Sequence, residues 1–303
     1  MASIASSKAS VGSKQEDEPP IIQFTTVQDL FDVINSTTSD FLTVTRIGLP
    51  SWSHVMVSTR LIRVDVSPHH FAQIERERDR RRRRFRFRRY DSNSQVLFIT
   101  LATHLYETLH LEIYYKYTAQ LVRSGQDESW SSMGKATFRA QPGPHGQDIG
   151  EGDSTGGPAL ERGGKHAWPT LVVEAAESEP LDELHNDMRW WFSASDHQVQ
   201  IILLAKFDHA RGDLTLEKWE EEPRSIRPGA TTTRQSDAIR PVLRQHITIT
   251  QDTTTDPASY HVTEALVLGF RLLFLRDPGP GERDFVLSIQ ELEKYAKRVW
   301  AVV

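Results

Sequence analysis

The stretch Trp168-Pro-Thr-Leu-Val-Val-Glu174 decides the fold of this 303-residue chain, because a short apolar run is typical of a buried strand. Residues 178–195 follow with helical spacing; Ser178 is the predicted N-cap, and Pro180 suits a first helical turn. Residues 199–207 form a second apolar run of strand length. Strand, helix and strand with short connections make a βαβ unit. The sequence therefore predicts an α/β fold with a mixed or parallel sheet.

Outward from this unit, helical and strand-like segments alternate along the chain. Helical spacing of apolar residues predicts helices at 27–34, 68–80, 104–122 and 288–300. The Gly- and Pro-rich residues 141–167 are predicted to form a loop. Runs rich in β-branched and aromatic residues predict strands at 41–47, 55–66, 95–101, 135–139, 214–220, 247–250, 266–268 and 270–275.

These segments also suggest how the chain is organised. Residues 1–20 are rich in Ser, Ala and Lys and then acidic, which predicts a disordered leader. We expect residues 21–84 to be an N-terminal extension that ends in an arginine-rich segment, and residues 85–222 to be the core. Residues 223–303 are expected to form a C-terminal β/α extension packed on that core.

The composition excludes several classes of protein. Hydrophobic residues make up 38% and charged residues 25% of the chain, and no apolar run approaches the roughly 20 residues of a membrane span. The absence of cysteine excludes disulfide scaffolds, thiol nucleophiles, zinc fingers and iron–sulfur clusters. The N-terminus has no apolar segment of the kind that a signal peptide needs. We therefore expect an intracellular protein, in the cytoplasm or the nucleus, without a membrane partner.

The charge is distributed very unevenly. Residues 75–90 contain ten arginines and three acidic residues, which give this segment a net charge of +7. Because the net charge of the whole chain is −5, the rest of the chain carries −12. Three interpretations remain open: a solvated insertion, a nuclear-localisation segment, and a contact with the nucleic-acid backbone. The alternation in Arg84-Phe-Arg-Phe-Arg88 also predicts a strand with its phenylalanines on one side. The residues predicted to contact nucleic acid are Arg81, Arg82, Arg83, Arg84 and Arg86.

A set of short sequence blocks carries a resemblance to a known family. In chain order they are Arg86-Phe-Arg-Arg-Tyr-Asp91, Gly134-Lys-Ala-Thr-Phe138, the 168–174 stretch, Ser178-Glu179, Leu184-x-x-Asp187-x-x-Trp190-Trp191, Glu217-Lys-Trp219 and Phe274-Leu-Arg-x-Pro278. Over roughly residues 85–300 the chain resembles the PD-(D/E)XK, or restriction-endonuclease-like, nuclease superfamily. It is more closely similar to a set of fungal intracellular proteins on that fold.

The resemblance implies a fold and a metal site. The family core is αβββαβ with a mixed central sheet, and an Asp and a Glu on adjacent strands bind Mg²⁺ or Mn²⁺, which activates water for phosphodiester hydrolysis. Glu174 falls on the second acidic position. Asp153 is the candidate for the first, with Asp148 in reserve, and Glu107 matches a glutamate that supplies a third ligand. The predicted metal ligands are therefore Asp153, Glu174 and Glu107.

The chain departs from the family pattern in two places. The motif lysine, which polarises the attacking water, would fall at Ala176 and is missing. Lys206 is the candidate replacement; Lys135 and Arg189 are alternatives. The proline before the first acidic residue is replaced by Gly152.

Two functions follow from the resemblance. One is a metal-dependent nuclease-like protein. The other is a catalytically inactive binding or scaffolding protein on the same fold, in the nucleus or beside a fungal biosynthetic pathway. An active enzyme needs converging carboxylates and a divalent ion, whereas an inactive relative could keep Glu174 paired with an arginine.

A second likeness is weak. Gly152-Asp-Ser-Thr-Gly-Gly-Pro158 is similar to the nucleophile loop of trypsin-like serine proteases. The inserted Thr155 would break the tight backbone that forms their oxyanion hole, and those double β-barrels contain no βαβ unit. The sequence also has no P-loop and no histidine pair with zinc-binding spacing, so nucleotide and zinc sites are not predicted.

Overall fold

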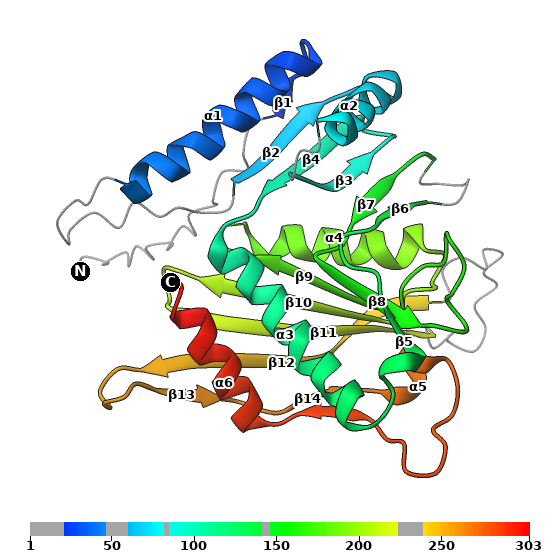
Figure 1. The fold of residues 1–303 in the computed structure, drawn as a ribbon, viewed down its shortest axis with the longest axis vertical. Helices are drawn as coiled ribbons and strands as arrows, with labels where there is room; N and C mark the ends of the chain where they lie inside the picture. The colour runs from blue at the N-terminus through cyan, green and yellow to red at the C-terminus, as the bar shows by residue number, and fades with distance from the viewer. Residues whose placement is uncertain (1–20, 47–59, 82–84, 141–145, 178, 224–238) are drawn as a thin grey trace, which may run out of the picture.

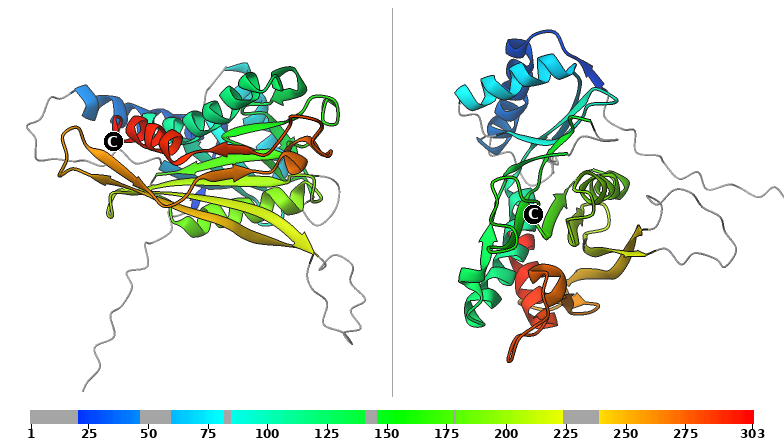
Figure 2. Two further views of the ribbon diagram at one scale, coloured as in Figure 1. Left: turned by 90° about the horizontal axis from the view of Figure 1, so that it is seen from below. Right: turned by 90° about the vertical axis from the view of Figure 1, so that its right-hand side faces the viewer.

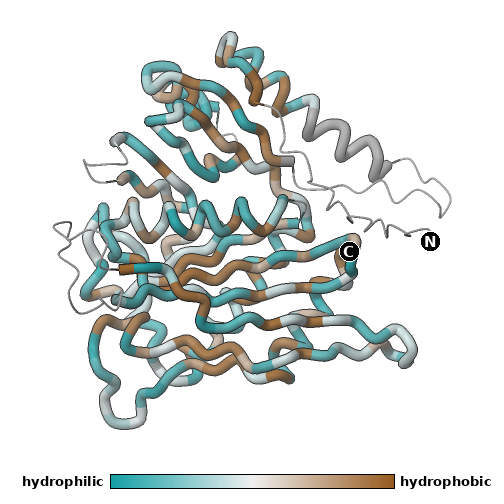
Figure 3. The backbone as a smooth tube through the Cα atoms, turned by 180° about the vertical axis from the view of Figure 1, so that it is seen from behind, coloured by the Kyte–Doolittle hydropathy of each residue, from teal (hydrophilic) through white to brown (hydrophobic). Residues whose placement is uncertain are grey.

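The computed structural model describes residues 21–46, 60–81, 85–140, 146–177, 179–223 and 239–303 (Figure 1). The described chain forms two large sheets with helices packed on them (Figure 2). In Figure 3 the hydrophobic stretches follow the strands of these sheets. The predicted leader 1–20, Arg82 to Arg84 and Ser178 lie outside the described residues.

The first sheet has six strands and lies at the N-terminal end of the molecule. Helices α1 (Val27–Arg46) and α2 (Pro68–Arg80) share one apolar core with it, built around Phe31, Phe71 and Phe87. Its spatial order is β1 (Ile21–Gln23), β2 (Arg60–Asp65), β4 (Val96–Leu101), β3 (Arg86–Asp91), β7 (Ile149–Glu151) and β6 (Thr137–Arg139).

The second sheet has seven strands between two layers of helices. Helices α3 (His104–Arg123), α5 (Phe270–Phe274) and α6 (Ile289–Trp300) pack on one face, and α4 (Leu181–Ala194) packs on the other. The order is β13 (Ser259–Val262), β12 (Ile239–Asp252), β11 (Asp213–Pro223), β10 (Ile201–Asp208), β9 (Leu171–Ala176), β8 (Ser154–Pro158) and β5 (Trp130–Ser132). A short pair, β14 (Leu266–Leu268) and β15 (Phe285–Leu287), and a 3-10 turn, η1 (Asp127–Ser129), complete the described elements.

The predicted βαβ unit is confirmed. Strands β9 and β10 pair in parallel, with Leu171 opposite Ile201, and α4 connects them. Strands β5, β8 and β9 are antiparallel neighbours, and β11 runs antiparallel to β10, so the sheet is mixed. The predicted α/β fold class is therefore confirmed.

The prediction of a loop over residues 141–167 is wrong, because strands β7 and β8 lie within it. Their glycines are positions of close packing rather than turn residues. A Cβ atom at Gly150 would lie 2.4 Å from the Trp190 ring, and one at Gly156 would lie 2.4 Å from the Tyr114 hydroxyl. The high glycine content therefore led to a loop prediction for two strands whose glycines pack against aromatic side chains.

Two predicted strands are helical in the structure. Nearly all of residues 41–47 continue α1, which Thr26 begins by accepting the Asp29 N–H at 3.1 Å; local β propensity is a weak preference that the longer helix overrides. Most of residues 270–275 belongs to α5, where Phe270 and Phe274 stack one helical turn apart at 4.5 Å between ring centroids. None of the helices in the described residues combines the length and apolar character that a membrane span requires.

Candidate functional site

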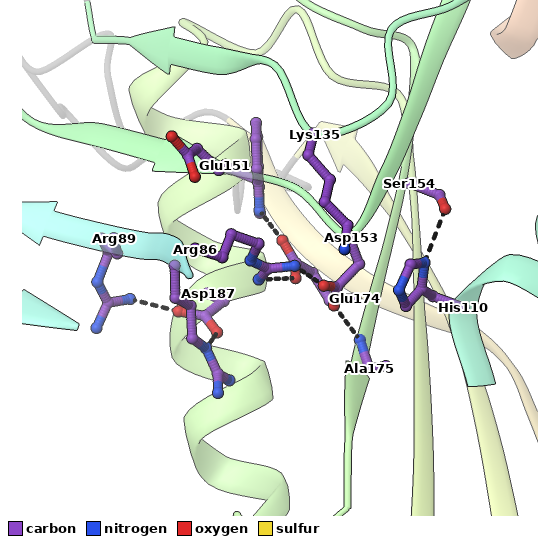
Figure 4. Close-up of polar contacts among 12 residues, drawn as sticks. Arg86, Arg89, His110, Lys135, Glu151, Asp153, Ser154, Glu174, Ala175 and Asp187 are labelled. Atoms are coloured by element: carbon purple, nitrogen blue, oxygen red, sulfur yellow. Dashed lines mark hydrogen bonds and ion pairs between the residues drawn. The ribbon is translucent and has the colours of Figure 1, made fainter. Parts of the chain in front are cut away.

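The two sheets meet where the chain passes from β7 to β8. Only Gly152 and Asp153 separate these strands, which belong to different sheets, so Asp153 lies at the junction. Strand β3 approaches from the first sheet. Phe87 enters the first core, while Arg86 pairs with Glu174 of the second sheet (Figure 4). Arg88 lies at an irregularity in the pairing of β3 with β4 and pairs with Glu179.

Asp153 is buried at this junction and accepts hydrogen bonds on both carboxylate oxygens. The Tyr106 hydroxyl lies 2.8 Å from each oxygen, and the backbone N–H of Ala175 donates to Oδ2 at 2.8 Å. Arg86 Nη1 forms an ion pair with Oδ1. Burial raises the pKa of Tyr106, so its phenol stays protonated and remains a donor.

Glu174, on the neighbouring strand β9, is bound in a similar way. Trp191 Nε1 donates to Oε1 at 2.7 Å, and Arg86 Nη2 donates to Oε2 at 3.1 Å. Burial raises the pKa of Glu174, against the lowering effect of the Arg86 guanidinium. A single arginine thus bridges Asp153 and Glu174, and Figure 4 shows its side chain lying against both.

Glu107, in the first turn of α3, forms a third part of the site. Its Oε1 pairs with Lys135, and its Oε2 lies 3.2 Å from His110 Nε2. His110 Nδ1 in turn lies 2.9 Å from the hydroxyl of Ser154, the residue after Asp153. Burial lowers the pKa of His110, so the neutral ring donates from Nε2 to Glu107 and accepts at Nδ1 from Ser154.

Arg88, a second arginine of β3, also bridges two acidic side chains. Arg88 is buried and pairs with Asp187 of α4 and, at 3.2 Å, with Glu179. Arg89 Nη1 contacts the other oxygen of Asp187 at 3.0 Å, and Arg78 Nη1 contacts Glu151 at 2.8 Å. The arginine-rich segment is therefore not simply a solvated insertion, because four of its arginines reach into the junction and pair with acidic residues.

The structure brings some of the predicted residues together and separates others. Asp153 and Glu174 face the junction, and in Figure 4 the Lys135 side chain points toward Asp153. Glu107 is linked to this place through Lys135 and through His110, which contacts Ser154. Lys206, in contrast, donates to the backbone oxygen of Glu179 at 2.8 Å, so its ammonium group is bound away from the three carboxylates.

The other candidates have local partners. Asp148 accepts from the Ser92 N–H and hydroxyl, each at 2.7 Å. Arg189 donates to Asn186 at 3.0 Å. Arg81 pairs with Glu77 and donates to Gln28 at 2.9 Å.

Sequence reasoning missed Arg86 as the partner of Glu174, along with Tyr106, Trp191 and His110. The alternation of arginine and phenylalanine was a usable signal, since it placed Arg86 and Arg88 on one face of a strand. Nothing in that pattern, however, indicated which carboxylates they would meet.

These contacts place a protein donor or cation on every oxygen that was expected to bind Mg²⁺ or Mn²⁺. All six oxygens of Asp153, Glu174 and Glu107 already accept from, or pair with, an N–H or O–H group of the protein. Within the described residues, no group of three or more His, Asp or Glu side chains is arranged to hold a metal ion. As built, the site does not fit the metal that the resemblance implies.

No protein-family model matches this chain. A search of curated proteins also finds no match. The chemistry of the junction must therefore be argued from its own residues. Ser154 and His110 are both buried, and each already has a hydrogen-bonding partner, so this pair offers no accessible nucleophile.

The contacts of Glu107 predict a pH-dependent contribution to stability. Burial alone would raise the pKa of Glu107, but hydrogen bonds from His110 and Lys135 outweigh this effect and lower it to about 2. The pKa of a glutamate in the unfolded chain is about 4.3. A lower pKa in the folded protein therefore stabilises the fold at pH values above about 4.3, and this stabilisation is lost as the pH falls toward 2. Because the side chain is 30% exposed, we discount the contribution to about 1 kcal/mol.

The measurement is urea unfolding of the wild type and Glu107→Gln at neutral pH and at about pH 3. We expect the wild type to be more stable at neutral pH and the difference to shrink by roughly half or more at the lower pH. A difference that does not change with pH would show that the charge of Glu107 is unimportant.

Proposed function

We propose that this chain is a non-catalytic binding or scaffolding protein on the restriction-endonuclease-like fold. The observation that carries the proposal is the bridge from Arg86 to both Asp153 and Glu174. These are the two positions where the resemblance places metal ligands. The guanidinium binds one oxygen of each carboxylate, where it competes with the metal ion that metal-assisted hydrolysis requires.

The assignment to this fold is supported by the order of elements in the second sheet. Helix α3, strands β5, β8 and β9, helix α4 and strand β10 follow one another in the order αβββαβ, apart from β6 and β7, which join the first sheet. Asp153 immediately precedes β8, and Glu174 lies on its neighbour β9. This agrees with a pair of carboxylates on adjacent strands.

A metal-dependent nuclease is the second candidate function. The observation that favours it is Lys135, which pairs with Glu107 and points toward Asp153, and could supply the positive charge missing at Ala176 (Figure 4). Asp153, Glu174 and Glu107 would be the ligands for Mg²⁺ or Mn²⁺. In this candidate function Arg86 would have to leave the carboxylates first.

A nucleic-acid partner is supported less well than the charge count suggested. Six arginines of the 75–90 segment pair with acidic side chains, which neutralises much of its charge: Arg78, Arg80, Arg81, Arg86, Arg88 and Arg89. Arg86, one of the predicted contacts, is buried. Binding of nucleic acid and localisation to the nucleus remain proposals for the exposed arginines of α2.

The function is tested by calorimetric titration of Mn²⁺ into the wild type and Glu174→Gln, together with nuclease assays on DNA and RNA. We expect no saturable binding to either protein, and cleavage by the wild type no faster than by the variant. Glutamine keeps the size of the side chain, so the fold should tolerate it better than alanine. Saturable binding that disappears in Glu174→Gln, together with metal-dependent cleavage, would establish the nuclease instead.

A further inference from the structure

We propose that Arg86 is the permanent counter-cation of this site: its guanidinium takes the place of a divalent ion and fixes the first sheet on the second. This inference rests on the proposed function and explains how the protein dispenses with a metal. It also assigns Arg86 a role that differs from nucleic-acid contact.

The burial of two carboxylates beside Arg86 requires a counter-cation. Asp153 and Glu174 are each 1% exposed, and Arg86 is 6% exposed. Two carboxylates buried close together repel one another and lose their hydration, so one of them must take up a proton or both must share a cation. Arg86 contacts both, as a bridging ion would.

The hydrogen bonds around the two carboxylates fix their orientation toward Arg86. Neutral donors hold both carboxylates: the Tyr106 hydroxyl and Ala175 N–H bind Asp153, and the Trp191 N–H binds Glu174. These donors orient the carboxylates, and Arg86 binds Oδ1 of Asp153 and Oε2 of Glu174. The site is therefore preorganised for one cation, and the side chain that supplies it is fixed by its own strand.

The cation is supplied by a strand of the first sheet. Arg86 belongs to β3 of the first sheet, whereas Asp153 immediately precedes β8 and Glu174 lies on β9 of the second sheet, 67 and 88 residues later in the chain. Arg88, two residues further along β3, makes the analogous contacts with α4. A dissociable ion would not connect the sheets in this way, because it has no covalent link to either.

The test is cation-dependent thermal unfolding of wild type, Arg86→Gln, Glu174→Gln and the double variant. We expect Mn²⁺ to leave the melting temperature of the wild type unchanged. Arg86→Gln should melt well below it, and added Mn²⁺ should restore part of the loss with a saturable dependence on concentration. In the double variant, one negative charge is removed with the positive charge. It should therefore melt above Arg86→Gln and lose the response to Mn²⁺.

Arg88→Gln is the matched control, since it breaks a second buried arginine bridge on the same strand. It should also lower the melting temperature but show no response to Mn²⁺, because Asp187 keeps its contact with Arg89.

The inference is overturned if Arg86→Gln is as stable as the wild type, or if Mn²⁺ fails to stabilise it. If Arg86→Gln does not fold, the double variant tests the inference, because removing the negative charge of Glu174 should allow the double variant to fold. A double variant that also fails to fold overturns the inference.

None of these outcomes contradicts the proposed function. The proposed function fails only if the wild type binds Mn²⁺ and cleaves nucleic acid.

Discussion

Replacing Arg88 by methionine is expected to lower the free energy of unfolding by about 3–5 kcal/mol. The side chain is 2% exposed and bridges Asp187 and Glu179, which are both buried. Methionine occupies a similar volume but supplies no charge and no donor. The substitution therefore leaves Glu179 without its ionic partner and Asp187 with Arg89 alone, in a region that water does not reach.

Arg80→Met is the matched control. Arg80 lies in the same arginine-rich segment and pairs with Glu77 one helical turn away, but its side chain is 70% exposed. Pairs of this kind contribute little, since water solvates both charges when the contact is lost. Chemical denaturation of the three proteins should leave Arg80→Met close to the wild type. If Arg88→Met behaved like Arg80→Met, the arginines of β3 would not be what holds the two sheets together.

The parts of the fold that could be predicted from the sequence are those with local signals. The start of α2 follows from Ser67, which caps its N-terminus, and from the proline that begins it. Helix α6 begins at a capping box in which Ser288 and Glu291 exchange hydrogen bonds. The βαβ unit was readable because each of its elements is bounded by turn residues and buries a continuous apolar face.

The parts that could not be predicted depend on contacts between distant segments. Strands β7 and β8 have few large side chains of their own, and they form where Gly150 and Gly156 accept aromatic rings from other elements. The arginine bridge is similar, because Arg86 and Glu174 lie 88 residues apart. The sequence did indicate that a buried Glu174 needs either a metal or an internal cation, and the structure pairs it with the internal cation.

Replacing Trp191 by alanine should have an effect as large as that of Arg88→Met, about 3–5 kcal/mol. Trp191 is 1% exposed, and its ring contacts those of Phe138, Trp168 and Trp190, with centroids 5.1–5.8 Å apart. Alanine would leave a cavity among these rings and would also remove the N–H that donates to Glu174. Packing and polar contacts at the junction are thus lost together.

Trp191→Phe separates the two contributions. Phenylalanine keeps most of the ring but leaves Glu174 Oε1 without its donor, so we expect a loss of about 1–3 kcal/mol. Trp219→Phe removes an equivalent N–H from Glu217, but that carboxylate oxygen keeps His185 at 2.7 Å and should lose less. Equal losses in the two phenylalanine variants, measured by urea unfolding, would contradict the role of the Trp191 N–H. A larger loss at Trp191 would mean that Glu174 depends on this donor as well as on Arg86, since Trp191 donates to Oε1 whereas Arg86 donates to Oε2.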